Sequence, residues 1–297
     1  MRVGIDLGGS KTEAVLISAD GSAMERLRRP TPVADGYEAI LQNVVDLVRE
    51  LESQTAERLR VGIGTPGSLS ARTGLLKNST TVCLTGQPVK ADLERLLGRE
   101  IRIANDANCF ALSEAIDGAG ADHGVVFGII MGTGVGGGIA IDGRVHEGRH
   151  QVAGEWGHNV LEADGPPCYC GKHGCVETFL SGPGLARDYQ EHGGTAGLNA
   201  QNIIARSRAG DIAAIAAVER FLDRFGRALS LVVNILDPDA IVLGGGLSNF
   251  DRLYTEGRER LARSVFNDEF TTPVLRNIHG DSAGVLGAAW LLPPNRN

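Results

Sequence analysis

Two glycine-rich segments of the chain follow the same pattern, 124 residues apart. Gly4-Ile5-Asp6-Leu7-Gly8-Gly9 is followed by an apolar run at 14–17, and Gly128-Ile129-Ile130-Met131-Gly132-Thr133 is followed by one at 138–141. Each copy predicts a strand, a glycine-rich turn and a second strand, so the free backbone N–H groups of the turn can face a phosphate. Two such hairpins indicate a duplicated fold that holds a nucleotide between its halves. Two unrelated glycine turns remain the alternative.

Short apolar runs and longer amphipathic segments alternate along the 297 residues. Residues 3–7, 60–64 and 240–243 predict strands, whereas 37–51 and 212–236 carry apolar residues at helical spacing. This alternation predicts the α/β class. A chain of this length is long for one core, so we expect two domains with a cleft between them.

Charge and hydropathy argue against two kinds of partner. The formal net charge is −7, whereas binding to nucleic acid or to an anionic membrane depends largely on clustered Lys and Arg. No segment offers the roughly 18 uninterrupted apolar residues of a membrane helix, and the first residues lack a signal-peptide pattern. We therefore expect a cytoplasmic protein that acts on a small molecule.

Two stretches look like familiar nucleotide-binding motifs but do not meet the full requirements of those motifs. Residues 9–12, Gly-Ser-Lys-Thr, lack the glycine directly before lysine and the following helix that a P-loop requires. Residues 132–137 have the spacing of a dinucleotide-binding turn, but a strand pattern follows where that site needs a helix. Neither motif explains the glycine-rich turns.

A polar pair, Asn105 and Asp106, lies between a predicted strand at 101–104 and a helical pattern at 107–116. Such junctions commonly carry ligand groups, although either residue would also be a good helix N-cap. Phosphoryl transfer needs an aligned hydroxyl, a base for its proton and cations to neutralise charge. We interpret Asp106 as the candidate base and Asn105 as a partner for sugar hydroxyls.

Three of the five cysteines lie within eight residues, at Cys168, Cys170 and Cys175, and His158 precedes them by ten. One imidazole and three thiolates fill a tetrahedral zinc shell and leave no position for a reactive water. The spacing therefore predicts a structural zinc in a loop at 158–175 rather than disulfides. His173 is a competing candidate ligand.

Two more polar side chains flank this cysteine cluster. Glu155 lies in Gly154-Glu155-Trp156-Gly157-His158, and Glu177 follows the last cysteine. Glu155 and His158 could bridge vicinal hydroxyls, and Glu177 could be a third such contact, although an isolated Glu or His is more typical of a solvated surface.

The two hairpins and a third stretch, Ile241 to Gly246, resemble the actin-like (ribonuclease-H-like) ATPase superfamily. The resemblance implies that the hairpins clamp the phosphates of ATP, that the third stretch meets the adenosine, and that Asp6 holds Mg²⁺. A hard cation beside phosphates suits a carboxylate, whereas the alternative for Asp6 is a cap on its own turn. The implied nucleotide contacts are Asp6, Gly8, Gly9, Ser10, Lys11, Thr12, Gly132, Thr133, Gly134, Gly136, Gly244, Gly245 and Gly246.

From Met1 to about Trp290, the chain resembles the ROK family, named for repressors, open reading frames and kinases. The motifs that carry the resemblance are 6–12, 105–108, 154–158 and the Cys-x-Cys-Gly-Lys-x-Gly-Cys-x-Glu stretch at 168–177. The resemblance implies Asp106 as base and His158 as both a zinc ligand and a sugar contact. The implied sugar contacts are Asn105, Asp106, Glu155, His158 and Glu177, with Gly67 and Thr80 as further candidates. The implied zinc ligands are His158, Cys168, Cys170 and Cys175.

Within the family, residues 78–80, 84–88, 167–170 and 177–179 look most like bacterial fructokinases of the manno(fructo)kinase type. We therefore expect an ATP-dependent hexose kinase that converts fructose to fructose 6-phosphate, with mannose and glucose as further substrates. A glucokinase, an N-acetylglucosamine kinase or an N-acetylmannosamine kinase of the same family is the alternative, because these sugars differ by one or two groups.

Other classes of protein fit less well. Repressors of the family place a DNA-binding domain before the sugar-binding body, whereas the first motif here starts within ten residues of Met1. A non-catalytic sugar-binding module would not need both hairpins and the Asn105-Asp106 pair. A zinc hydrolase would need an open ligand position.

We expect residues 1–118 to form an N-terminal actin-like domain on which the segment 282–297 packs. Residues 119–281 then form the C-terminal domain with the zinc loop. The family resemblance also implies a homodimer.

Overall fold

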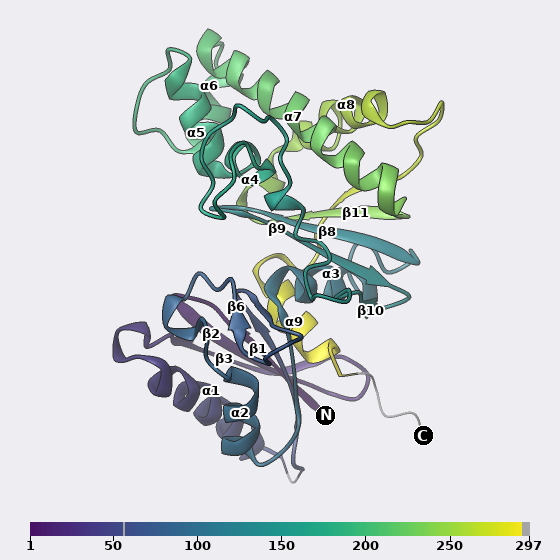
Figure 1. Ribbon diagram of the computed structural model, residues 1–297. Helices are drawn as coiled ribbons and strands as arrows, with labels where there is room; N and C mark the ends of the chain where they lie inside the picture. Colours follow the sequence, from purple (N-terminus) through teal and green to yellow (C-terminus); the bar gives the residue numbers. More distant parts are fainter. Residues whose placement is uncertain (56, 293–297) are drawn as a thin grey trace. The chain divides into compact units, whose positions relative to one another are not determined.

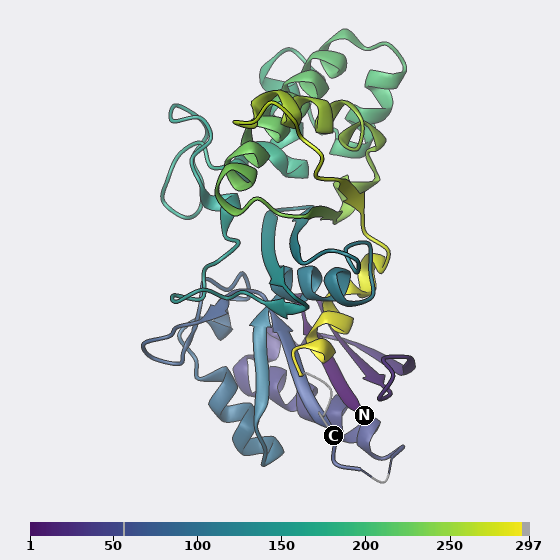
Figure 2. The ribbon, with the colours of Figure 1, turned by 90° about the vertical axis from the view of Figure 1, so that its right-hand side faces the viewer.

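The computed structural model describes residues 1–55 and 57–292 (Figures 1 and 2). It contains two five-stranded sheets with the strand orders β3-β2-β1-β4-β7 and β10-β9-β8-β11-β12. In each sheet, the first three strands of the set follow one another at one edge, and the later strands extend the other edge. The α/β prediction is confirmed, and the matching strand orders agree with the repeat in the sequence.

The first sheet begins with an antiparallel meander and continues with parallel strands. β1 pairs antiparallel with β2 and parallel with β4, and β4 pairs parallel with β7. Its strands are β1 (Arg2–Leu7), β2 (Lys11–Ile17), β3 (Ala23–Pro30), β4 (Arg60–Thr65) and β7 (Ile101–Asn105). A small separate sheet pairs β5 (Ser68–Leu69) with β6 (Leu76–Lys77).

Helices cover the first sheet because their apolar residues fall on one side. In α1 (Tyr37–Glu52), Ile40, Val44 and Val48 recur every four residues and are buried against the sheet residues Val3 and Ile5. The other elements of this part are α2 (Val89–Leu97), α3 (Asp106–Ile116), α9 (Ala283–Trp290) and the 3-10 turns η1 (Val33–Asp35), η2 (Val82–Leu84) and η6 (Gly280–Ser282).

The second sheet has the same mixed character, since β11 pairs parallel with both β8 and β12, and β10 pairs antiparallel with β9. Its strands are β8 (Val125–Met131), β9 (Val135–Ile141), β10 (Arg144–Val145), β11 (Ala240–Gly244) and β12 (Val274–Arg276). The helices and turns of this part are η3 (Trp156–His158), α4 (Val176–Leu180), α5 (Gly182–Glu191), α6 (Ala200–Arg208), α7 (Ile212–Leu236), η4 (Gly246–Asn249), η5 (Asp251–Leu253) and α8 (Glu256–Ser264).

The described residues form two compact units. The first comprises 1–118, 138–153 and the described residues from 281 onward, and the second comprises 119–137 and 154–280. The sequence-based division differs at 138–153, which it assigned to the C-terminal domain. Gly138 packs closely on α3 of the first unit, where a Cβ would lie 2.3 Å from the carbonyl oxygen of Ala107. Of the predicted segment 282–297, residues 293–297 lie outside the described residues.

Within the described ranges, no helix combines the length and the apolarity needed to cross a membrane.

Candidate functional site

The first glycine-rich turn joins β1 to β2 and is fixed by backbone and threonine contacts. Gly8 N donates to Lys11 O at 3.0 Å, and Thr31 N donates to Ser10 O at 3.0 Å. The Thr31 hydroxyl donates to Gly8 O at 2.7 Å and pairs with the Thr12 hydroxyl at 2.9 Å. These hydrogen bonds fix the turn and the start of β2, which together contain the residues 8–12 that the sequence analysis assigns to the nucleotide.

Asp6, at the end of β1, lies in an acidic and buried neighbourhood. Burial, together with the charges of Asp106 and Glu13, raises the pKa of Asp6 to about 6, and Lys11 opposes this shift. Glu13 pairs with Asp6 across β1 and β2, and α9 begins nearby, where a Cβ on Gly284 would lie 3.2 Å from Asp6 Oδ2. A half-buried carboxylate with two acidic neighbours fits a divalent cation, because the cation offsets both the desolvation and the repulsion that raise the pKa.

Asn105 and Asp106 occupy the junction between β7 and α3, as the sequence predicts. Asn105 is the N-cap of α3, since its Oδ1 accepts from Ala107 N at 2.9 Å, and Asp106 Oδ1 accepts from the same N–H at 2.8 Å. Asn105 Nδ2 donates to Gly67 O at 3.4 Å. The cap interpretation thus holds for Asn105, and the structure brings Gly67 to the same junction.

Gly67 has a φ of +87°, and a Cβ there would lie 2.4 Å from Lys77 O, so only glycine fits. Thr80 is exposed. Its neighbour Thr81 lies against the first turn instead, where a Cβ on Gly9 would lie 3.3 Å from the Thr81 hydroxyl. That hydroxyl is buried and has no hydrogen-bond partner among the described residues. Sequence reasoning missed Thr81, which no motif distinguishes from Thr80.

The second glycine-rich turn joins β8 to β9 and borders a large pocket of the second unit. Gly132 N donates to Gly134 O at 2.9 Å, and Gly182 N, at the start of α5, donates to Gly132 O at 2.8 Å. The pocket has a volume of about 830 Å³, a size that suits a small-molecule cofactor. Its lining is Gly132, Thr133, Gly182, Pro183, Ala186, Arg187, Gln190, Glu191, Gly197, Leu198, Asn199, Ala200, Gln201, Gly246 and Leu247.

Three of the predicted nucleotide residues, Gly132, Thr133 and Gly246, line this pocket directly. Gly245 lies behind them, with a φ of +77° and no room for a Cβ beside Met131 O, which would be 2.4 Å away. Gly136 lies in β9, and Gly244 ends β11. The sequence analysis missed the walls from α5 and from 197–201, which come together only when the chain folds.

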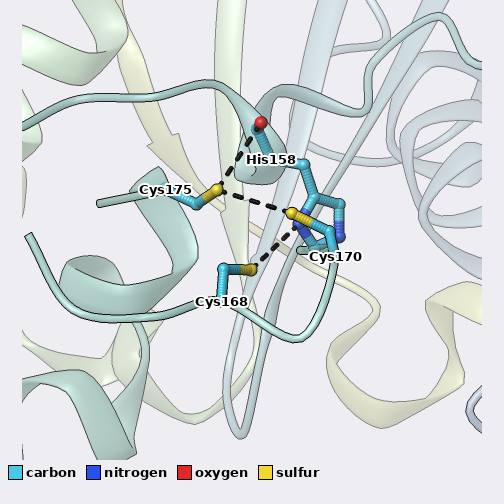
Figure 3. Close-up of side chains that lie close together, drawn as sticks. All are labelled: His158, Cys168, Cys170 and Cys175. Atoms are coloured by element: carbon cyan, nitrogen blue, oxygen red, sulfur yellow. Dashed lines mark hydrogen bonds between the residues drawn. The ribbon is translucent and has the colours of Figure 1, made fainter. Parts of the chain in front are cut away.

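His158, Cys168, Cys170 and Cys175 converge, with one ligand atom of each lying within 4.8 Å of the others (Figure 3). Cys168 Sγ lies 3.6 Å from His158 Nδ1, and Cys170 Sγ lies 3.6 Å from Cys175 Sγ. Thiolates bound tetrahedrally to one zinc at 2.3 Å would be about 3.8 Å apart. All five cysteines are described and free, so the set fits zinc rather than a disulfide.

Among the described residues, the group that could hold a metal contains His158 and not His173. His158 Nδ1 faces the sulfurs, and its Nε2 lies 2.9 Å from the Tyr169 hydroxyl, with the two rings perpendicular at 88°. The two nitrogens therefore have different partners. Sequence reasoning did not assign a role to Tyr169.

Glu155 and Glu177 lie in segments that pack on β9. A Cβ on Gly137 would lie 2.5 Å from Gly154 O, just before Glu155, and Trp156 is buried. Glu177 Oε2 accepts from Val135 N at 2.9 Å. Burial, with Glu177 and Glu155, raises the pKa of Tyr169 to about 12, so both carboxylates act on the same hydroxyl.

The sequence model of the ROK family matches residues 2–294. N-acetyl-D-glucosamine kinases from Yersinia pseudotuberculosis and Escherichia coli are each 40% identical over 301 aligned residues, which cover 98% of this chain and at least 98% of theirs. The ROK hexokinase of Thermus thermophilus superposes with a TM-score of 0.88 at 31% identity, covering 98% of this chain and 97% of that one. The Streptomyces griseus ROK glucokinase, solved with glucose and AMPPNP, gives 0.78 at 28% identity, with 97% of each chain covered.

Proposed function

The chain belongs to the ROK family of sugar kinases, and we propose that it phosphorylates N-acetylglucosamine with ATP as the phosphoryl donor. Named sugar kinases among its relatives make it an ATP:sugar phosphotransferase of the actin-like fold. The observation that carries the choice of sugar is the 40% identity to N-acetyl-D-glucosamine kinases over 98% of the chain. Nearly full coverage means that the predicted site residues lie inside the aligned region.

The curated relatives favour the alternative of the sequence analysis over its main expectation. Fructose was the expected substrate, on the strength of short stretches such as 167–170 and 177–179. No N-acetylglucosamine-specific motif was recognised, so the choice between these sugars rests on whole-chain similarity. Hexoses that differ at one position are separated by only about 1–3 kcal/mol, so fructose, mannose and glucose remain substrates to be assayed.

We assign the base to Asp106. A sugar hydroxyl oxygen attacks the γ-phosphorus of ATP, the bond from that phosphorus to the β–γ bridging oxygen breaks, ADP leaves, and the hydroxyl proton passes to the Asp106 carboxylate. Asn105 holds the start of α3 and so fixes the direction of the neighbouring carboxylate. Asn105, Glu155, His158, Glu177 and, at the edge, Gly67 and Thr80 are the proposed sugar contacts.

ATP would occupy the 830 Å³ pocket, with its phosphates toward Gly132 and Thr133, and the first glycine-rich turn carries the remaining predicted phosphate contacts. Asp6 would hold Mg²⁺, which neutralises charge on the phosphates as the transfer proceeds. Between them, Lys11 and the backbone N–H groups of the turns supply the donors that a polyphosphate needs. The remaining proposed contacts are Gly8, Gly9, Ser10, Thr12, Gly134, Gly136, Gly244 and Gly245.

We assign a structural zinc to His158, Cys168, Cys170 and Cys175. Four protein ligands close the shell, so the metal would order the loop rather than activate water. With Nδ1 on the metal, His158 would keep its proton on Nε2, now beside the Tyr169 hydroxyl, and become a fixed donor.

The test is a coupled ADP-release assay with MgATP and protein of measured zinc content. N-acetylglucosamine, N-acetylmannosamine, fructose, mannose and glucose are compared by kcat/KM, and the product is identified by mass. We expect the highest kcat/KM for N-acetylglucosamine. A higher value for fructose would restore the first expectation, and no sugar-dependent ADP release would refute the kinase assignment. A homodimer stays a prediction, which sedimentation of the purified protein would test.

A further inference from the structure

The turn between β8 and β9 lies beside both the proposed nucleotide pocket and a proposed sugar contact, Glu177. Gly132 and Thr133 line the nucleotide pocket, whereas the next two residues, Gly134 and Val135, contact Glu177. In the proposed function, Glu177 is a sugar contact. Its carboxylate nevertheless lies on the turn that we assign to the phosphates.

The contact between Glu177 and the turn is close and specific. Glu177 Oε2 accepts from Val135 N at 2.9 Å, a hydrogen bond to an ionised acceptor. A Cβ on Gly134 would lie 2.5 Å from the same oxygen, so the glycine makes room for the carboxylate. Gly134 has no left-handed φ, and its lack of a side chain is therefore explained by this approach rather than by its backbone conformation.

The carbonyl of Val135 lies against a second segment. A Cβ on Gly157, in η3, would lie 2.3 Å from Val135 O, so η3 packs directly on this residue. Both polar groups of Val135 thus meet segments that carry proposed sugar contacts. Val135 itself is buried. The first residue of β9 therefore contacts both η3 and α4.

The short helix that carries Glu177 depends on outside contacts for its position. With five residues, α4 is too short to be stable alone. Its N-cap is Cys175, whose carbonyl accepts from Thr178 N at 2.9 Å and from the Thr178 hydroxyl at 2.7 Å. Arg187, which lines the nucleotide pocket, donates to Thr178 O. A metal-binding cysteine therefore starts the helix, and a pocket residue holds it.

We propose that Glu177 is a positioning residue of the nucleotide site: through Val135 N it fixes the turn whose first residues receive the phosphates. This inference rests on the proposed function, because that function assigns the turn to ATP. One carboxylate oxygen serves the turn, and the second is available for the sugar. A residue that only contacts the sugar would have no effect on nucleotide binding when sugar is absent.

Two substitutions of Glu177 separate hydrogen bonding from charge. Glu177→Gln removes the charge but keeps an oxygen that can accept from Val135 N, whereas Glu177→Ala removes both. The dissociation constant of MgADP is measured by titration calorimetry without sugar, on metal-loaded full-length protein. We expect Glu177→Gln to bind MgADP as well as the wild type or better, since a negative charge near phosphates is lost. We expect Glu177→Ala to bind about fivefold more weakly than Glu177→Gln, the usual effect of one hydrogen bond.

Glu155→Ala is the matched control, because Glu155 is also a proposed sugar contact but, among the described residues, makes no hydrogen bond to the turn at 132–135. Its KM for sugar should rise while its MgADP affinity stays at the wild-type value. Glu177→Gln should likewise raise the KM for sugar. If Glu177 has both roles, Glu177→Gln should impair the use of sugar but bind MgADP normally. Glu177→Ala should impair the use of sugar and also weaken MgADP binding.

Gly134→Ala approaches the same contact from the other partner and covers the case in which Glu177→Ala fails to fold. The new methyl group would displace the carboxylate, so this variant should also weaken MgADP binding. Its effect should largely disappear when measured in a Glu177→Ala background, as expected for two changes to one contact.

Equal MgADP affinity of folded Glu177→Ala, Glu177→Gln and wild type would overturn the positioning role alone. Additive effects of Gly134→Ala and Glu177→Ala would overturn it too, since the methyl group would then act on the phosphates directly. Failure of the wild type to bind any adenine nucleotide would instead remove the assignment of the turn, and the proposed function with it.

Discussion

At the scale of the residue, two side chains share one peptide N–H at the start of α3. Asn105 and Asp106 both accept from Ala107 N, so the cap does not depend on Asp106 alone. Asp106→Asn would keep an acceptor at that position and lose only the basicity of the carboxylate. We expect turnover to fall by about 10³-fold, with MgADP affinity and thermal stability within error of the wild type.

Steady-state kinetics and calorimetry check this prediction, and Asp164→Asn serves as the control because Asp164 is exposed in the zinc loop. The control should retain full activity. Turnover of Asp106→Asn within tenfold of the wild-type value would remove Asp106 from the proton transfer.

A second residue, Asp188 in α5, joins one wall of the 830 Å³ pocket to α7 through ion pairs. It is 8% exposed and bonds Arg220 at 2.6 Å and Arg224 at 2.7 Å. Burial alone would raise the pKa of Asp188, but the hydrogen bonds and charges of these arginines outweigh it and hold the pKa below its ordinary value. Asp188→Asn leaves Arg220 without its counter-charge and Arg224 paired with Glu162 alone, so we expect a loss of about 2 kcal/mol in unfolding free energy at pH 7.

The pH dependence of that loss has a defined sign. A carboxyl whose pKa is lowered on folding stabilises the protein above its unfolded pKa, near 3.8, and loses that contribution as the pH falls through the lower folded value. The difference between wild type and Asp188→Asn should therefore narrow below about pH 4. Denaturant titrations at pH 7 and pH 3.5 measure it, with the exposed Asp223→Asn as control. A difference that stays constant with pH would contradict the ion-pair explanation.

At the scale of the element, the loop at 158–175, which carries the proposed zinc ligands, has little regular secondary structure. Among the described residues, no helix or strand follows η3 until α4, and the loop between them is joined by turns, two isolated bridges and backbone hydrogen bonds such as Leu161 N to Gly174 O at 2.8 Å. Cys168→Ser should therefore lower the zinc content from one ion per chain toward zero and make the loop sensitive to protease. Metal analysis and limited proteolysis measure both effects.

The loop prediction has its control in the same chain. Cys83→Ser changes a cysteine outside the group of metal ligands and should keep the zinc. A zinc content that is unchanged in Cys168→Ser would contradict the ligand assignment.

Glycines allow α9 to pack tightly in the first unit. A Cβ on Gly287 would lie 1.7 Å from Cys109 O in α3, and one on Gly62 in β4 would lie 1.9 Å from Ala288 O. Gly287→Ala must separate these elements, so we expect a loss of about 2–3 kcal/mol in unfolding free energy, despite the better helix propensity of alanine. Gly246→Ala is the control for denaturant unfolding, since its Cβ would come no closer than 3.6 Å to a flexible glutamine. Equal stability of the two variants would show that α9 can shift without loss.

At the scale of the whole molecule, the two proposed substrates should mark different parts of the chain. All residues of the 830 Å³ pocket belong to the second unit, whereas Asn105 and Asp106 lie in the first. We expect MgADP to slow amide exchange at 182–191 and 197–201, and N-acetylglucosamine to slow it at 101–110 and 155–177. Hydrogen–deuterium exchange with mass spectrometry measures this, and α1 should be unaffected by either ligand.

Protection by MgADP that omits 182–201 would place the nucleotide elsewhere. If the sugar leaves amide exchange unchanged at 101–110 or at 155–177, the residues of that segment would be removed from the proposed sugar contacts.

Several parts of this organisation could be predicted from the sequence because they depend on neighbours along the chain. The two strand–turn–strand copies follow from glycine spacing and apolar periodicity, and the junction of Asn105 and Asp106 follows from the change of period around them. The convergence of Cys168, Cys170 and Cys175 follows from their close spacing, and His158 lies only ten residues before them. Short chain separations leave few ways to arrange such groups.

The tertiary structure alone decided the contacts between residues far apart in the chain. The bond from Val135 to Glu177 joins residues 42 positions apart, the pocket gathers 132–133, 182–201 and 246–247, and 138–153 groups with the first unit because Gly138 fits α3. Glycine spacing cannot reveal such partners, because a missing Cβ permits a close approach without specifying what approaches. Local sequence therefore determined the turns, the helix cap and the proposed metal ligands. Packing of the folded chain determined which side chains and pocket walls lie against those turns.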